Sequence, residues 1–373
     1  MLKIIRSEAA FIVTALSAVA FYTIGKGWLD GFGNPILYTA LFLWLFGTML
    51  WSSFSSVRHA DCLAVLLGEP LGTLVLTISV ISIEVSVIAA VMLHAGPNPT
   101  LARDTMLAVI IIVLNGMVGL SLLVGGIRHR EQNYNLQGTR SYLSVIITLA
   151  TLSLILPRFT TSTSGPTLTT SQGLLFAVIT VLLYATFLAM QTVRHRDYFI
   201  VQGEAQEAPQ HGSHHGRKGP LKPRSTTYHA IFLMLTLIPI VLLSKKLAIV
   251  VDFGTDALGL PVALGGVLVA ILVLSPEGFA AYEAAAINHL QRAVNICLGS
   301  ALATISLTVP AVVVIGLISG IHVELGLDPN EMVLLVLTLI ISVLTFGGTH
   351  TNMLQGAVHL VIFFAYLVLI FQP

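Results

Sequence analysis

Long apolar runs recur along this chain from end to end, and they constrain its fold more than any other feature. A run of 18 or more mostly apolar residues can cross the hydrocarbon core of a bilayer as a helix. The longest polar stretch between such runs covers only residues 194–227, and 9% of all residues are charged, against about 25% in soluble domains. The sequence therefore predicts an all-α polytopic membrane protein embedded in lipid, without a large soluble domain.

We expect eleven membrane-spanning helices. With the N-terminus in the cytoplasm, 13 of the 18 lysine and arginine residues fall on the inside, as the positive-inside rule requires. The five on the outside are Lys26, Arg103, Arg158, Lys245 and Lys246. An odd number of spans then puts the C-terminus outside. The expected ranges are 8–25, 35–53, 65–93, 105–127, 142–158, 172–193, 228–248, 258–285, 294–319, 330–348 and 351–371.

The order of these spans suggests an internal repeat. Residues 1–30 hold an additional N-terminal helix, residues 31–193 a first set of five helices, and residues 228–373 a second set. Because five is odd, the second set enters the membrane in the opposite sense, which is the inverted repeat of many transporters. Between the sets, residues 194–227 form a cytoplasmic linker. Its histidines, His211, His214 and His215, fit a solvated linker better than a metal site.

Two glutamates, Glu84 and Glu277, lie deep inside apolar runs, one in each set. A charge at bilayer depth costs roughly 2.5–3.5 kcal/mol, so such residues usually have a function. No lysine or arginine lies in either run to pair with them. A buried pair of carboxylates can hold a metal ion or protons, but not both together, which is the chemistry of an antiporter. We therefore predict that Glu84 and Glu277 bind the transported metal cation, or protons in its place.

Further oxygen ligands are expected from residues near these spans. The candidates are Asn115 and Ser300 in the spans that follow each glutamate, with Glu69, Glu283 and Asn295 near span ends. Thr304 offers another hydroxyl, and helix breaks at Pro276 and Gly278 would expose carbonyl oxygens. His359, in GAVHLVIFF, is expected to be a packing histidine with a hydrogen bond.

Three stretches carry a resemblance to a known family: GEPLGTLVLTISVISIEVSVIAAVM, SPEGFAAYEAAAINHLQRAVNICLGSALATISLTVP and TNMLQGAVHLVIFFAYLVLIF. Together they resemble the bacterial ChaA-type calcium/proton antiporters of the calcium:cation antiporter superfamily, which includes the CAX exchangers. The resemblance covers nearly the whole chain. It implies two inverted five-helix repeats with an extra N-terminal helix, a location in the bacterial inner membrane, and an acidic ion ligand at Glu84 and at Glu277. The small polar pairs of the family correspond to Asn115-Gly116 and Gly299-Ser300.

The predicted function is export of Ca²⁺, and of Na⁺ or K⁺, in exchange for H⁺ by alternating access, with no cofactor. Two alternatives remain: a monovalent cation/proton antiporter with little calcium transport, and a cation channel. An enzyme is not expected, because the sequence has no HExxH zinc motif and no GxxxxGK[ST] phosphate loop. A net charge of +1 gives no reason to expect nucleic-acid binding. The sequence does not predict an oligomeric state.

Overall fold

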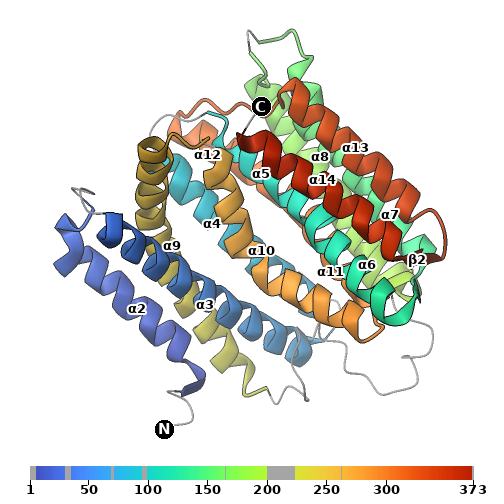
Figure 1. The fold of residues 1–373 in the computed structure, drawn as a ribbon, viewed down its shortest axis with the longest axis horizontal. Coiled ribbons are helices and arrows are strands. Elements are labelled where there is room, and N and C mark those ends of the chain that lie inside the picture. The colour runs from blue at the N-terminus through green and yellow to red at the C-terminus, as the bar shows by residue number, and fades with distance from the viewer. Residues whose placement is uncertain are drawn as a thin grey trace.

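The computed structural model describes residues 6–29, 35–68, 71–94, 99–163, 165–199, 223–261 and 263–371. Within these residues the fold is a bundle of eleven helical segments with one short two-stranded ribbon (Figure 1). Eight segments are long and apolar enough to cross a membrane, and three shorter apolar helices accompany them. The predicted all-α fold class and number of helices are confirmed.

Two sets of five helical segments follow helix α2 (Ala9–Tyr22) and its short extension η1 (Ile24–Gly27). The first set begins with α3 (Pro35–Leu67) and α4 (Leu71–His94). Its third member is continuous through α5 (Leu101–Ile111), η2 (Ile112–Met117) and α6 (Val118–His129). The fourth is α7 (Leu136–Ala150) with η3 (Thr151–Ile155) and η4 (Leu156–Arg158), and the fifth is α8 (Thr170–Ala189) with η5 (Met190–Arg194), followed by η6 (Arg196–Phe199). The second set contains α9 (Thr226–Leu258), α10 (Ala263–Ala286), α11–η8–α12 (Leu290–Ala303, Thr304–Thr308, Val309–Ser319), α13 (Pro329–Thr345) and α14 (Met353–Phe371).

The third member of each set contains a π-helical turn, η2 in the first set and η8 in the second. Such turns widen a helix locally and are frequent at functional sites. The two sets therefore share a distortion at corresponding elements, which a hydrophobic pattern alone does not reveal.

Helix α3 is longer than the sequence suggested. Its predicted end at residue 53 is wrong, because the helix continues to Leu67. The polar segment that follows residue 53 looked like a loop, but Ser56, His59 and Asp61 are buried within the helix. Gly68 then has a φ of +65°, the left-handed conformation in which glycine ends helices. The predicted start of the next span at residue 65 is therefore also wrong.

A second boundary differs for the same reason. Helix α9 runs to Leu258, where the sequence predicted an end at residue 248 and a new span from residue 258. Gly259 ends α9 with a φ of +62°, and α10 begins at Ala263. In both places a left-handed glycine decides where one helix stops.

Helices α4 and α10 lie between two groups of helices. On one side α3 and α9, the first helices of the two sets, pack along each other, and α2 lies against both. We call these three helices the α3–α9 layer. On the other side α14 packs along α6, α8 along α12, and α7 along α11. Figure 1 shows the α3–α9 layer at one edge of the bundle, with α4 and α10 running beside it.

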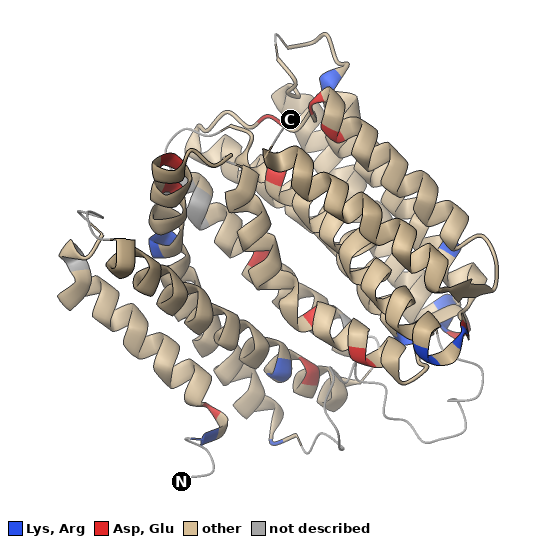
Figure 2. Cartoon of the chain, viewed as in Figure 1, with Lys and Arg blue, Asp and Glu red and all other residues tan. Residues whose placement is uncertain are grey.

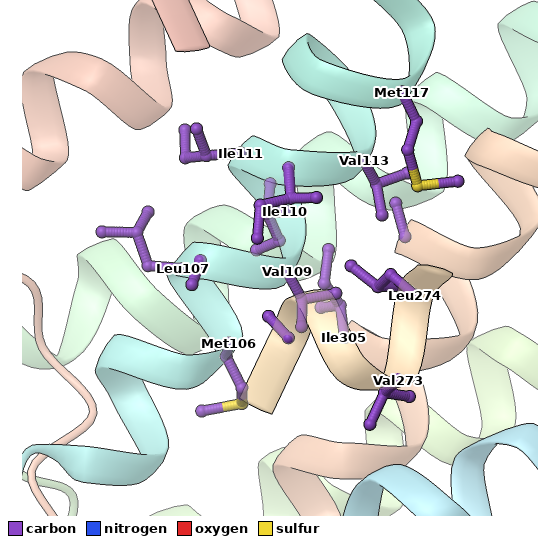
Figure 3. Packing of buried hydrophobic residues seen from close by; sticks show 14 of the residues in the cluster. Met106, Leu107, Val109, Ile110, Ile111, Val113, Met117, Val273, Leu274 and Ile305 are labelled. Carbon is purple, nitrogen blue, oxygen red and sulfur yellow. The ribbon is translucent and has the colours of Figure 1, made fainter. Parts of the chain in front are cut away.

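The packing between the sets is reciprocal. Helix α4 of the first set packs against η8 of the second, and α10 of the second packs against η2 of the first. Figure 3 shows the apolar part of this core, where Val109, Val113 and Met117 meet Leu274 of α10 and Ile305 of η8. These residues are buried, so the π-helical turns are enclosed by close apolar packing.

A short antiparallel ribbon ties the two sets together at one end of the bundle. Strand β1 (Glu131–Asn133) pairs with β2 (His350–Asn352), with Gln132 opposite Thr351. Helix α8 ends and α9 begins at the same end, which we call the linker end (Figure 1). Charged residues gather mainly near the ends of the helices, with isolated acidic positions along the helices between (Figure 2).

Candidate functional site

The two central helices each carry one buried glutamate. Glu84 lies on α4 and is 2% exposed, and Glu277 lies on α10 and is 8% exposed. The carboxylates are close enough to interact electrostatically. The structure therefore brings together these two predicted residues, which are far apart in the sequence and belong to different sets.

Glu84 is held by hydroxyl groups of the opposite set. Thr304 donates a hydrogen bond of 2.8 Å to Oε2 of Glu84, and Thr308 donates one of 3.2 Å to Oε1. Both threonines belong to η8 and are fully buried. A hydroxyl can donate to a carboxylate or turn its lone pairs toward a cation. Glu84 with these two threonines is therefore a set of hard oxygen ligands.

Glu277 lies in the same region, within electrostatic reach of Glu84. The thiol of Cys297, a free and buried cysteine of α11, is close enough to interact electrostatically with the Glu277 carboxylate. A Cβ atom on the neighbouring Gly278 would meet the Met117 side chain of η2 at 3.4 Å. A side chain could therefore be accommodated here at ordinary van der Waals distance, and α10 runs beside the π-helical turn at the position of Glu277.

The predicted helix break at Pro276 and Gly278 is wrong, because α10 is one helix from Ala263 to Ala286. Pro276 nevertheless lacks an N–H group and cannot donate to the carbonyl of Leu272, one turn earlier. The hydroxyl of the preceding Ser275 donates to the carbonyl of Ile271, so it does not replace the missing bond to Leu272. The proline thus frees a carbonyl group without interrupting the helix.

Asn115 is fully buried in η2, but its side chain is bound in a separate network. Its amide nitrogen donates to Thr338 of α13 at 2.8 Å, and its oxygen lies 3.0 Å from Nδ1 of His359 on α14. The other ring nitrogen of His359 lies 3.0 Å from the hydroxyl of Thr345. His359 is therefore a buried, hydrogen-bonded histidine, as its sequence context indicated.

Among the remaining candidates that the structure describes, Asn295 is the one whose side-chain contacts are defined. Asn295 donates to the carbonyl of Phe199 and accepts from Gln291, near the linker end. Glu283 and Ser300 are half-buried, six residues beyond Glu277 and on α11 respectively. Glu69 lies outside the described residues, as do His211, His214 and His215 of the linker. For all these candidates the ligand role remains a prediction.

One residue that contacts Glu84, Thr308, was not among the candidates predicted from the sequence. Thr308 lies one turn beyond Thr304 in the segment TISLT, so both hydroxyls face the same way. The only sequence signal was this spacing. Among the described residues no group of three or more histidine, cysteine, aspartate or glutamate side chains could hold a metal ion. Within the described residues, the candidate site thus consists of two carboxylates and two hydroxyl groups, which are the oxygen ligands that hard cations prefer.

A helical membrane bundle in which each of two repeated halves supplies one buried carboxylate is the architecture of a secondary ion transporter. A family model described as sodium/calcium exchanger protein matches residues 37–193 and 228–372. The chain belongs to this family, as its resemblance to the calcium:cation antiporter superfamily implied. It is therefore a multi-pass membrane transporter with two repeated exchanger domains. It is neither an enzyme nor a channel.

Individual relatives agree with this assignment. The chain is 39% identical over 364 residues to the sodium-potassium/proton antiporter ChaA of Escherichia coli, covering 98% of this chain and 96% of that protein. It is 42% identical over 336 residues to y4hA of Sinorhizobium fredii, which is named as an ionic transporter, covering 90% and 89%. Its fold matches the solved structure of native YfkE with a TM-score of 0.73 at 19% identity, covering 98% of this chain and 100% of the other.

Proposed function

We propose that this protein is a cation/proton antiporter that exports Ca²⁺, and also Na⁺ or K⁺, in exchange for H⁺ by alternating access. The observation that carries the proposal is the contact of Glu84 with Thr304 and Thr308, beside Glu277. Every ligand in this group is an oxygen, and the ligands come from both repeats. A movement of one repeat relative to the other therefore changes the site itself.

Exchange follows from the charge of the pair. Two buried carboxylates that interact repel each other unless a cation or protons neutralise them. One divalent ion matches both charges, and it must displace the protons that would otherwise occupy them. Because each carboxylate is neutralised either by a proton or by the cation, every positive charge that the cation brings displaces a proton from the pair. Glu84 and Glu277 are the proposed shared binding groups, with Thr304 and Thr308 as neutral ligands.

Monovalent exchange with little calcium transport is the second candidate, and one specific observation favours it. The E. coli relative that is similar over almost its full length is named a sodium-potassium/proton antiporter. Carboxylate and hydroxyl oxygens suit sodium as well as calcium, so the ligand types are compatible with both ions. A panel of Ca²⁺, Na⁺, K⁺ and Mg²⁺ in one transport assay separates the two candidates.

We also propose how the protein is oriented in the membrane and which residues form each repeat. The linker end faces the cytoplasm of a bacterial cell with the protein in its inner membrane, so the N-terminus is inside and the C-terminus outside. The excess of lysine and arginine on that side supports this orientation. Residues 31–193 and 228–373 are the two inverted repeats, residues 1–30 hold the additional helix, and residues 194–227 are the linker.

Everted membrane vesicles with a pH-sensitive dye test the proposal. Adding the transported cation to vesicles with an acidic interior should discharge the proton gradient when the wild-type protein is present. We expect Glu84→Gln and Glu277→Gln each to abolish this response, because an amide neither carries the charge nor exchanges a proton. A matched control is Glu324→Gln, in the loop between α12 and α13, which should behave like wild type. Full exchange by both site variants would refute the paired-carboxylate mechanism.

A further inference from the structure

Two buried side-chain oxygens near the contact of α6 with α10 have no hydrogen-bond partner among the described residues. They are Oγ of Ser121, on α6, and Oε1 of Gln132, on β1. Ser121 is 2% exposed and Gln132 is 3% exposed. A buried polar atom without a partner costs about 1–3 kcal/mol, and in native proteins such atoms usually serve a bound water, an ion or a reaction. The transport site as described above uses neither oxygen.

Ser121 lies on the face of α6 that packs against α10. It follows Met117 by four residues and precedes Gly125 by four, so these three positions share one face of the helix. Met117 fixes the direction of this face, because a Cβ atom on Gly278 of α10 would meet its side chain at 3.4 Å. Gly278 is the neighbour of Glu277, so Ser121 is one turn from the level of that carboxylate.

Gln132 closes the same contact at its other end. Its amide nitrogen donates to the carbonyl of Ala285, near the end of α10, at 3.0 Å and to Oδ1 of Asn288 at 2.9 Å. Because a backbone carbonyl only accepts, the nitrogen of the amide must lie on this side. Oε1 therefore faces α6, where it takes the position that a Cβ atom on Gly125 would occupy.

The two oxygens thus lie along one line between the linker end and Glu277. Helices α6 and α10 both end at the linker end, where Nε2 of His129 lies 3.1 Å from the carbonyl of Ala286. Successive positions on this face are one helical turn apart, about 5.4 Å. One water molecule can bridge two oxygens at that spacing. We call the contact from Gln132 through Ser121 to Glu277 the α6–α10 seam.

The hydroxyl of Ser121 is not committed to its own helix. Serines in helices often donate to the carbonyl four residues earlier, and Ser79 and Ser82 of α4 do so. Ser121 makes no such bond within the described residues. A hydroxyl can accept one hydrogen bond and donate another at the same time, so it can pass a proton on. The amide oxygen of Gln132 only accepts, so it can hold a water molecule in place.

The oxygens of the seam suit a proton better than the transported cation. Calcium takes about six to eight oxygen ligands, whereas a buried water needs only about two to four polar partners. The hydroxyl and the amide are both neutral, so they offer a metal ion little in exchange for its hydration shell. Glu283, five residues after Gly278 on α10, lies on a different face of that helix and adds no charge to the seam.

Resting on the proposed cation/proton exchange, we propose that the α6–α10 seam is the route of the proton between the linker end and Glu277, separate from the route of the cation. A proton leaves bulk water at the linker end, and water held by Gln132 passes a proton to Ser121. The hydroxyl accepts this proton and gives up its own toward Glu277, whose carboxylate binds the last proton in the line. Because α6 and α10 belong to different repeats, the line is continuous only in one relative position of the repeats.

The test compares two exchange modes of the full-length protein in proteoliposomes, with radioactive sodium or calcium as the tracer. Cation/proton exchange is driven by a pH gradient. Cation/cation exchange is measured with the same cation on both sides and equal pH. Both modes need the cation to reach its site, but only the first needs a proton to reach Glu277. A wild-type protein that performs only the second mode would refute the proposed function itself.

The decisive variants are Ser121→Val and Ser121→Thr, which have the same shape and differ in the hydroxyl. We expect Ser121→Val to lower the maximal rate of cation/proton exchange about tenfold, a modest part of what a positioned proton-transfer group can contribute. Cation/cation exchange and the KM for the cation should stay as in wild type, and Ser121→Thr should restore the proton-coupled rate. Ser144→Val is the matched control, since its hydroxyl lies on the exposed side of α7.

A second variant tests the other end of the seam. Gly125→Ala puts a methyl group where Oε1 of Gln132 lies, and the end of a flexible side chain can move away, so the fold should tolerate it. It should slow cation/proton exchange selectively, as Ser121→Val does. If Ser121→Val and Gly125→Ala slowed both modes equally, the seam would be a cation route or a packing element. If neither variant slowed the proton-coupled mode of a protein that exchanges cations for protons, the proton would take another path. Either result would overturn the proposal.

Discussion

The hydroxyl of Thr304 donates a 2.8 Å hydrogen bond to Glu84, and the two residues belong to opposite repeats. Thr308 adds a second bond to the same carboxylate from the same π-helical turn. Because its side chains come from both repeats, such a site is complete only in one relative position of the two repeats. The bond therefore links occupancy of the site to the relative position of the halves, which is what alternating access requires.

Removing the Thr304 hydroxyl should weaken cation binding. A hydrogen bond to a charged group contributes about 1.5–3 kcal/mol, and about 1.4 kcal/mol corresponds to a tenfold change in affinity. We expect Thr304→Val to raise the KM for the cation about tenfold, and Thr304→Ser to restore it. The dye assay in everted vesicles measures both. Thr186→Val, whose hydroxyl bonds only within its own helix on the exposed side of α8, should leave KM unchanged.

The sequence indicated the two glutamates because each is an isolated charge within an apolar run. It also predicted the number of helices, because the length of an apolar run is a direct requirement of the bilayer. Thr304 and Thr308 carry no comparable signal. Threonine is common in membrane helices, where its hydroxyl often bonds to its own backbone. Only the packing of η8 against α4 directs these two hydroxyls to Glu84.

The errors in helix boundaries have a related cause. Polar residues after position 53 suggested a loop, yet Ser56 donates to Thr236 of α9 and Arg58 donates to Glu8, so neighbouring segments of the bundle supply their partners. The partners of Asn115 were equally out of reach, since His359 lies 244 residues away along the chain. Periodicity reports which residues prefer an apolar environment. It does not report which polar groups meet across helices that are distant in sequence.

Competition between protons and the cation should appear as a pH-dependent KM. If the cation displaces protons from Glu84 and Glu277, raising the pH removes its competitor, so the KM for the cation should fall as pH rises. Measuring initial rates in vesicles at several cation concentrations and pH values separates this effect from the maximal rate. A KM that stays constant across neutral to alkaline pH would be incompatible with a shared site.

Close packing of α6 against α14 depends on glycine. A Cβ atom at Gly356 would lie 2.7 Å from the carbonyl oxygen of Gly119 and closer still to the backbone nitrogen of Leu123. We expect Gly356→Ala to destabilise the protein by about 1–3 kcal/mol through this overlap, visible as a lower unfolding temperature in detergent. Gly47→Ala is the matched control, because nothing lies within 4 Å of its added Cβ. It should be neutral or slightly stabilising.

Stability should depend on pH through Glu8. Its pKa is lower in the folded protein than the ordinary value of 4.5, so the unfolded chain binds more protons at acid pH. The stabilisation is therefore fully present above pH 4.5 and decreases as the pH falls below that value. We expect Glu8→Gln to lower the unfolding temperature at pH 7, with the difference from wild type shrinking below pH 4.5. A difference that grew in acid would contradict this sign.

His359 should act by orienting Asn115. The imidazole donates from Nδ1 to the amide oxygen, and the amide nitrogen then faces Thr338, so the side chain has one orientation. His359→Gln can keep the donor and should support exchange with a near-normal KM. His359→Leu removes the donor and leaves the amide oxygen buried without it, which should disturb the π-helical turn η2 where it packs against α10 and Glu277, so KM should rise while the pH profile of the maximal rate stays as in wild type. If both variants lost exchange equally, with unfolding temperatures unchanged, His359 would have a role beyond positioning, such as carrying the transported proton.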